Sequence, residues 1–210
     1  MPLILRKLRK KSSWESRGIT WLGPGQLQAD VFGDLATKQN MLSVYKVGDN
    51  TRSDTLDRVI AALAVAGTEH ISDKFEYLLF DESILQTLGI KIAHNKGETP
   101  DLEVDALHID LIELSADRLL SLAVAMSGGT KERRLKKEVR TLVAQGILKG
   151  HIERSKLKLN VSELSRIDLE IRSLSGAVAE MSPVVEHLPP QKGRVARLLE
   201  SFRSKLRMRR

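Results

Sequence analysis

The feature that most constrains the fold is an alternation of strand-like and helix-like segments between residues 41 and 113. Residues 41–47 have the alternating side chains of a strand. Residues 54–66 then carry apolar side chains at helical spacing, and Ser53 is a suitable N-cap. Residues 75–80 form a nearly continuous apolar run, which is typical of a strand covered on both faces.

Two further strands are predicted, one at 90–94 and one at 105–113, with a short helix between Asp81 and Leu88 before the first of them. Strands that alternate with helices are typical of right-handed crossovers between parallel strands. We therefore expect an α/β fold with a small mixed, partly parallel sheet and crossover helices.

The rest of the chain is predicted to be helical. Ser115 caps a first helix, and a second begins at Thr130. Within residues 151–175, apolar side chains at spacings of three and four favour a helix, whereas the alternation over 167–171 leaves a strand open. The predicted organisation is a basic N-terminal tail (1–14), an acidic α/β domain (15–128), a helical hairpin (129–182), a proline-containing linker (183–193) and a basic amphipathic helix (194–210).

Charge is segregated along the chain, although the formal net charge is only +7. Residues 1–12 hold five basic side chains and no acidic one, and residues 190–210 hold eight basic and one acidic. Residues 13–128 hold eighteen acidic and nine basic side chains. Basic ends of this kind attract an acidic partner, which is nucleic acid, another protein or, ranking below these, an anionic membrane surface. The alternative is that they only solubilise the chain or fold back on its acidic half.

The basic side chains expected to contact phosphate groups or a partner lie near both ends and in the predicted hairpin. They are Arg6, Lys7, Arg9, Lys10, Lys11, Arg133, Arg134, Lys137, Arg194, Arg197, Arg203, Lys205 and Arg207. No motif for reading a base sequence accompanies them.

One loop and one strand carry side chains suited to catalysis. His94, Glu98 and Asp101 follow the third predicted strand, where they are candidates for an acid–base or metal-assisted site. His108 and Asp110 share one face of the next strand, about 7 Å apart, so they are candidates for a shared metal or for a carboxylate that orients an imidazole. The alternatives are a solvated loop and the polar face of an edge strand.

Several classes of site have no counterpart in the sequence. The absence of cysteine excludes disulfides, cysteine-ligated zinc and thiol nucleophiles. There is no glycine-rich phosphate loop and no serine in a nucleophile elbow, and we expect no cofactor. The first residues do not resemble a secretory signal and no apolar run approaches a membrane span of about 20 residues, so we expect a cytoplasmic protein.

The sequence thus predicts a non-catalytic binding or accessory protein that contacts a protein partner or nucleic acid through its basic ends. The alternative is a small metal-dependent hydrolase or nuclease that uses the polar residues 94–110.

Overall fold

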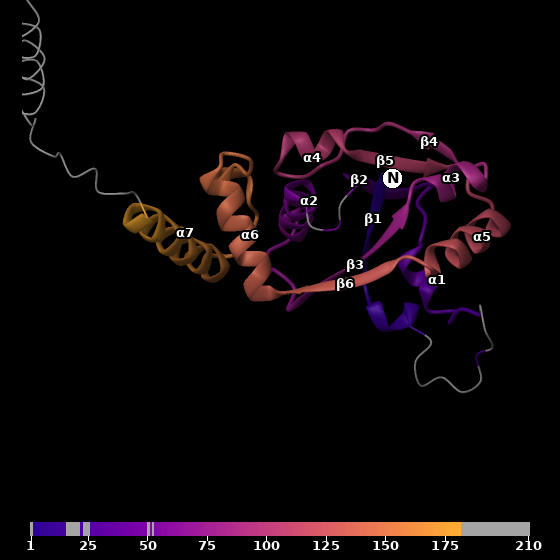
Figure 1. The fold of residues 1–210 in the computed structure, drawn as a ribbon, viewed down its shortest axis with the longest axis horizontal. Coiled ribbons are helices and arrows are strands. Elements are labelled where there is room, and N and C mark those ends of the chain that lie inside the picture. The colour runs from indigo at the N-terminus through magenta and orange to yellow at the C-terminus, as the bar shows by residue number, and fades with distance from the viewer. Residues whose placement is uncertain (1, 16–21, 23–25, 50, 52, 182–210) are drawn as a thin grey trace, which may run out of the picture. The chain divides into compact units, whose positions relative to one another are not determined.

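The computed structural model describes residues 2–15, 22, 26–49, 51 and 53–181, with side chains as far as residue 176 (Figure 1). The chain divides into two compact units, Met1–Ser175 and Gly176–Arg210. The described helices and strands are β1 (Leu3–Leu8), η1 (Lys11–Trp14), α1 (Val31–Asp34), β2 (Leu42–Gly48), α2 (Asp54–Val65), β3 (Lys74–Asp81), α3 (Ser83–Thr87), β4 (Lys91–Ala93), α4 (Leu102–Ala106), β5 (His108–Ile112), α5 (Ala116–Ser127), β6 (Thr130–Leu135), α6 (Lys136–Leu148), η2 (Arg154–Lys156) and α7 (Val161–Met181).

The α/β fold is confirmed, but the expectation of a partly parallel sheet is wrong. The described strands form one sheet in the order β4-β5-β2-β1-β3-β6. Every neighbouring pair in this order is antiparallel.

The reason is that a strand of opposite direction lies between each pair of strands that run the same way. Since β2 and β3 both pair antiparallel with β1, they share one direction, and α2 connects them. In the same way β5 lies between β2 and β4. The sequence pattern indicated β2, β3, β4 and β5 as strands, but it missed β1 and β6 and did not give the order in which the strands pair.

The strand β1 replaces part of the expected N-terminal tail. It pairs with β2 on one side and with β3 along six residues on the other. Ile4 and Leu5 are fully buried, so the apolar residues of this basic segment belong to the core. Arg6 is also taken into the fold: its guanidinium donates to the carbonyl oxygens of Asp34 (3.0 and 2.6 Å) and Ser43 (2.7 Å).

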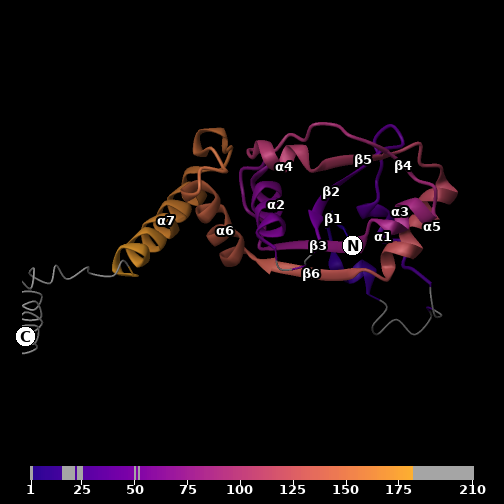
Figure 2. The ribbon, with the colours of Figure 1, turned by 45° about the horizontal axis from the view of Figure 1, so that its top comes forward.

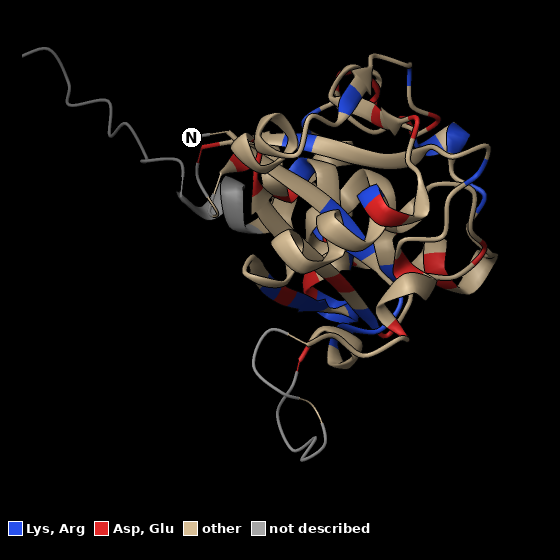
Figure 3. Ribbon diagram, turned by 90° about the vertical axis from the view of Figure 1, so that its right-hand side faces the viewer, with Lys and Arg blue, Asp and Glu red and all other residues tan. Residues whose placement is uncertain are grey.

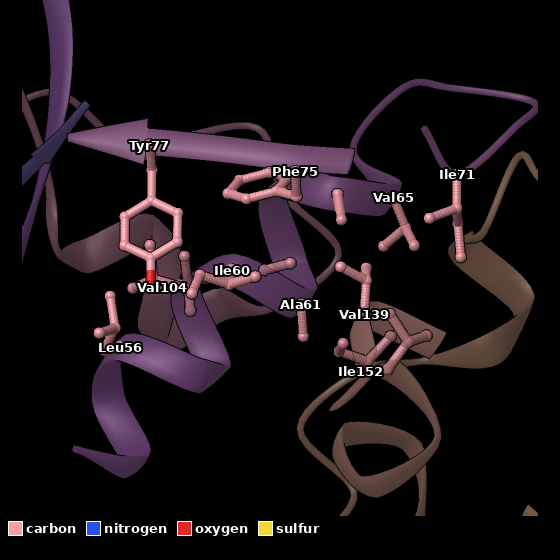
Figure 4. Packing of buried hydrophobic residues seen from close by; sticks show 14 of the residues in the cluster. Leu56, Ile60, Ala61, Val65, Ile71, Phe75, Tyr77, Val104, Val139 and Ile152 are labelled. Carbon is pink, nitrogen blue, oxygen red and sulfur yellow. The ribbon is translucent and has the colours of Figure 1, made fainter. Parts of the chain in front are cut away.

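One face of the sheet is covered by α2, α4, α6 and the first part of α7. Phe75 and Tyr77 project from β3 toward this layer, close to Ile60 of α2 (Figure 4). Val139 of α6 and Ile167 of α7 are fully buried in the same cluster. The 3.6-residue apolar period of these helices is what lets each bury one stripe against the strands.

The other face of the sheet is covered by α1, α3 and α5, which lie together on the opposite side in Figures 1 and 2. Ile4, Val44 and Leu78 point to this face, and all three are fully buried. Because neighbouring residues of a strand point to opposite faces, β1, β2 and β3 supply side chains to both cores.

Residues 130–135 are the edge strand β6, so the helix expected to begin at Thr130 starts later, at Lys136. The backbone of β6 pairs with β3 over its whole length, which overrides the helical preference of its charged side chains. Gly129 permits this approach, since a Cβ there would lie 2.3 Å from the carbonyl oxygen of Leu79.

The last described element, α7, resolves the choice between helix and strand for residues 161–175, whereas residues 151–160 hold only the short turn η2. The chain is helical from Val161, and Ile167, Ile171 and Leu174 pack against the first core. The predicted linker (183–193) and basic helix (194–210) lie outside the described residues. Among the helices that are described, none is long and apolar enough to cross a bilayer.

Truncating Leu5 tests whether β1 is part of the core. We expect Leu5→Ala to lower the free energy of unfolding by about 2–5 kcal/mol, because it leaves a cavity in a buried cluster. Urea unfolding followed by circular dichroism measures this loss. Leu102→Ala is the control, since that side chain is 62% exposed. Equal, small effects of the two substitutions would show that β1 is a dispensable tail.

Candidate functional site

The polar loop after β4 is held in place by Asp105 of α4. Thr99 donates to Asp105 Oδ1 from its backbone nitrogen (2.7 Å) and from its hydroxyl (2.8 Å). The backbone nitrogen of Gly97 donates to the Asp105 carbonyl oxygen at 3.1 Å. The fit around Gly97 is tight, since a Cβ there would lie 3.0 Å from Asp105 Oδ1. This buried carboxylate therefore fixes the shape of the loop.

Asp101, a predicted catalytic residue, ties the loop to two helices. Its Oδ1 caps α4 by accepting from the backbone nitrogens of Glu103 (3.0 Å) and Val104 (3.2 Å). The same oxygen accepts from Arg58 Nη2 of α2 at 2.8 Å, and Arg58 Nε bonds Oδ2. Burial alone would raise the pKa of Asp101, but Arg58 and the two backbone donors lower it below its usual value.

His108 and Asp110 lie on one face of β5, as their spacing predicts, with His108 Nε2 3.5 Å from Asp110 Oδ1. Asp110 accepts hydrogen bonds from the Ser43 hydroxyl (2.7 Å) and the Asn95 side chain (2.6 Å). Burial acts to raise the pKa of Asp110, but these two donors and nearby His108 lower it.

The imidazole of His108 is oriented by the loop and by an aromatic ring. Its Nδ1 lies 2.9 Å from the carbonyl oxygen of Asn95, so this nitrogen is the donor. The Tyr45 ring lies against it, with 5.1 Å between ring centroids. The pKa of Tyr45 is raised to about 12, mainly by burial and to a smaller extent by the charges of Asp105 and Asp110.

The structure does not gather the predicted catalytic residues into one site. His94 and Glu98 are exposed, whereas Asp101, His108 and Asp110 are buried. The buried carboxylates accept bonds from the chain itself, which leaves few lone pairs for a substrate or an ion. Within the described part of the chain, no three His, Asp or Glu side chains are arranged to hold a metal ion.

A second polar region lies where β1 ends beside the start of β3. There a cavity of about 540 Å³ opens, which we name the β1 groove; its walls are Arg6, Lys7, Leu8, Arg9, Asp34, Ser72, Lys74 and Glu76. Lys7, Arg9 and Lys74 are exposed. Lys7 Nζ lies 5.3 Å from the centroid of the Phe75 ring, and loss of hydration lowers the pKa of this lysine.

The two carboxylates of the β1 groove bond to donors that hold the fold. Asp34 accepts from the indole nitrogen of Trp14 at 2.8 Å and from the backbone nitrogen of Arg9 at 2.5 Å. Glu76 accepts from the backbone nitrogen of Lys11 at 2.6 Å. The β1 groove is thus lined by four cationic and two acidic side chains, and both carboxylates accept hydrogen bonds that hold the fold.

The predicted contact residues separate into three sets. Arg6 is bonded inside the fold, Lys11 pairs with Glu15 at 3.3 Å, and Arg134 lies 3.6 Å from Asp57. Exposed positions hold Lys7, Arg9, Lys10, Arg133 and Lys137. Arg194, Arg197, Arg203, Lys205 and Arg207 lie outside the described residues.

Sequence analysis missed Lys74 as a member of the basic surface. It lies alone within the acidic part of the sequence, and only the pairing of β3 with β1 brings it to Lys7 and Arg9. Across the described ribbon, Lys and Arg positions lie among Asp and Glu positions rather than apart from them (Figure 3).

Comparison with protein-family models, with curated proteins and with solved structures found no match to this chain.

Replacing Asp101 tests whether it is a structural carboxylate. Because its pKa is lower in the folded chain, it stabilises the fold above its unfolded pKa of about 3.9, and this contribution is lost as pH falls through the folded value. Asp101→Asn keeps an N-cap but removes the charge opposite Arg58. We expect it to be less stable than the natural protein by about 2 kcal/mol at neutral pH, with a smaller difference in acid.

Urea unfolding at several pH values measures this difference. Asp168→Asn is the matched control, since Asp168 also meets an arginine through two bonds, but on the surface. It should cost less. Equal losses for both substitutions would contradict a special role for Asp101.

Proposed function

We propose that this protein is a non-catalytic binding protein that holds nucleic acid by its phosphate groups in the β1 groove. The observation that carries the proposal is the composition of that groove. It presents the exposed cations Lys7, Arg9 and Lys74, while its carboxylates bond to an indole and to backbone nitrogens.

Further cations extend this surface beyond the groove. Lys10 follows Arg9 and is exposed. Arg133 of the edge strand is exposed and is the pairing partner of Glu76, which lines the groove. The backbone that carries these cations is ordered by strand pairing, which favours contact with a regularly charged backbone.

The chemistry of these residues favours phosphate contacts over base reading. Lys and Arg contacts to phosphate oxygens position a protein on nucleic acid without selecting a sequence. The aromatic side chains beside the groove, Trp14 and Phe75, are both buried, so they offer no platform for stacking bases. We therefore propose binding that depends on charge and little on sequence.

The hydrogen bonds that the polar loop residues make within the fold support a non-catalytic role. Asp101 and Asp105 hold the loop and α4, and Asp110 bonds Ser43 and Asn95. The metal-dependent hydrolase therefore remains a prediction from the sequence, for which the described geometry adds no support.

Salt-dependent binding tests the proposal. Fluorescence anisotropy with a short labelled DNA duplex should show affinity that falls steeply between about 50 mM and about 200 mM salt. Lys7→Ala, Arg9→Ala and Lys74→Ala should each weaken binding and reduce the slope of log affinity against log salt by about 0.9, the value for one lost phosphate contact.

Lys158→Ala is the matched control, because Lys158 is exposed but does not line the groove. It should leave the slope unchanged. Equal effects of all four substitutions, or binding that survives high salt, would contradict a phosphate-binding groove. Binding of a labelled acidic peptide, without binding of the DNA duplex, would instead favour the protein partner that the sequence leaves open.

A further inference from the structure

The outer edge of β6 is open to a further strand. The order of the sheet places β6 at one end, where β3 is its only neighbour among the described strands (Figure 1). The strand has six residues, whereas β4 at the other end of the sheet has three. An edge strand presents a row of unpaired N–H and C=O groups, and an extended peptide binds such a row by adding a strand to the sheet.

Two hydrogen bonds show which backbone groups of β6 point outward. The N–H of Lys136 donates to the carbonyl oxygen of Asp73 at 2.9 Å, so the even-numbered residues bond toward β3. The N–H of Leu135 instead donates to a glutamate side chain of α6 at 2.6 Å. Because successive residues of a strand direct their backbone groups to opposite sides, those of Lys131 and Arg133 point away from β3. Within the described chain these outward groups have no hydrogen-bond partner.

The side chains of the same outward residues are cationic or apolar. Lys131, Arg133 and Leu135 point to one face of the sheet, since alternate residues of a strand share a face. Arg133 and Leu135 are exposed, and no described residue forms an ion pair with Arg133. Lys131 is half-buried, and its ammonium group donates to the carbonyl oxygen of Ser127. Arg133 is therefore the main charge that this edge offers to a partner.

A second copy of this chain is a poor fit to the edge of β6. A strand that adds antiparallel exchanges hydrogen bonds with Lys131 and with Arg133. If β6 paired with its own copy about a two-fold axis, these cations would lie opposite one another. Like charges directly opposite destabilise a strand pair, and charged edges are a common protection against self-pairing. The edge therefore favours a different strand, one with acidic side chains at alternate positions.

We infer that β6 binds an extended acidic segment of another protein as an added antiparallel strand. Two acidic residues of the partner, separated by one residue, lie opposite Arg133 and Lys131 and exchange backbone hydrogen bonds with them. An apolar residue two positions before the first acid packs on Leu135, which is 50% exposed. From its N-terminus the motif is thus apolar-x-acid-x-acid. The site needs the backbone of β6, which does not line the β1 groove, so it is independent of the proposed function.

Fluorescence anisotropy with the full natural chain and a labelled peptide containing Leu-Thr-Glu-Thr-Glu-Thr tests the inference. Methylating the backbone nitrogens of both glutamates removes the donors to β6 without changing the charge, and it should weaken binding by about 10-fold or more. Methylating the threonine before each glutamate is the matched control. Those N–H groups point away from β6, so the affinity should not change. Equal losses for the two methylated peptides, or no binding of the unmethylated one, would overturn the inference.

Charge reversal tests the register of the added strand. Arg133→Glu should weaken binding of the peptide by about 10-fold, and a peptide with lysine in place of its first glutamate should restore it. Lys137→Glu is the matched control, because Lys137 is exposed but lies on α6, and it should have a smaller effect. Lys7→Ala should weaken binding of DNA but not of the peptide, which separates this edge from the β1 groove. Failure of the lysine peptide to bind the folded Arg133→Glu variant would contradict the register.

Discussion

The placement of β1 between β2 and β3 is the constraint on which the rest of the structure depends. Ile4 and Leu5 point to opposite faces, so this one strand contributes to both hydrophobic cores. Arg6 extends the role, because it bonds the carbonyl oxygens of Asp34 and Ser43, 28 and 37 residues further along the chain. The basic N-terminus is therefore inseparable from the fold, and the cations that follow it are presented by an ordered strand.

The polar loop between β4 and α4 shows how chemistry-bearing residues serve structure. Asp105 bonds Thr99, Asp101 pairs with Arg58, and Asp110 accepts from Asn95. A buried carboxylate is tolerated only when hydrogen bonds replace its lost hydration. Here the loop supplies some of those bonds, and Arg58 of α2, Ser43 of β2 and the backbone of α4 supply the others. Asp101 and Asp110, which resemble members of a catalytic cluster in the sequence, make hydrogen bonds that hold the loop in place.

The edge strand β6 presents its arginines on both faces of the sheet. Arg133 pairs with Glu76 of the β1 groove, whereas the next residue, Arg134, lies 3.6 Å from Asp57 of α2. Alternation along a strand sends neighbouring side chains to opposite faces. One edge strand thus offers cations to two separate surfaces.

The sequence by itself determined the elements with a clear apolar period, such as α2 with its Ser53 cap and the buried run of β3. It also placed His108 and Asp110 on one face, since a strand repeats every two residues. Only the tertiary structure decided that β1 and β6 are strands. Both are rich in charged residues, and their backbones become stable as strands by pairing with β3. It alone brought Lys74 to the β1 groove and Arg58 to Asp101, since neither contact is local in the chain.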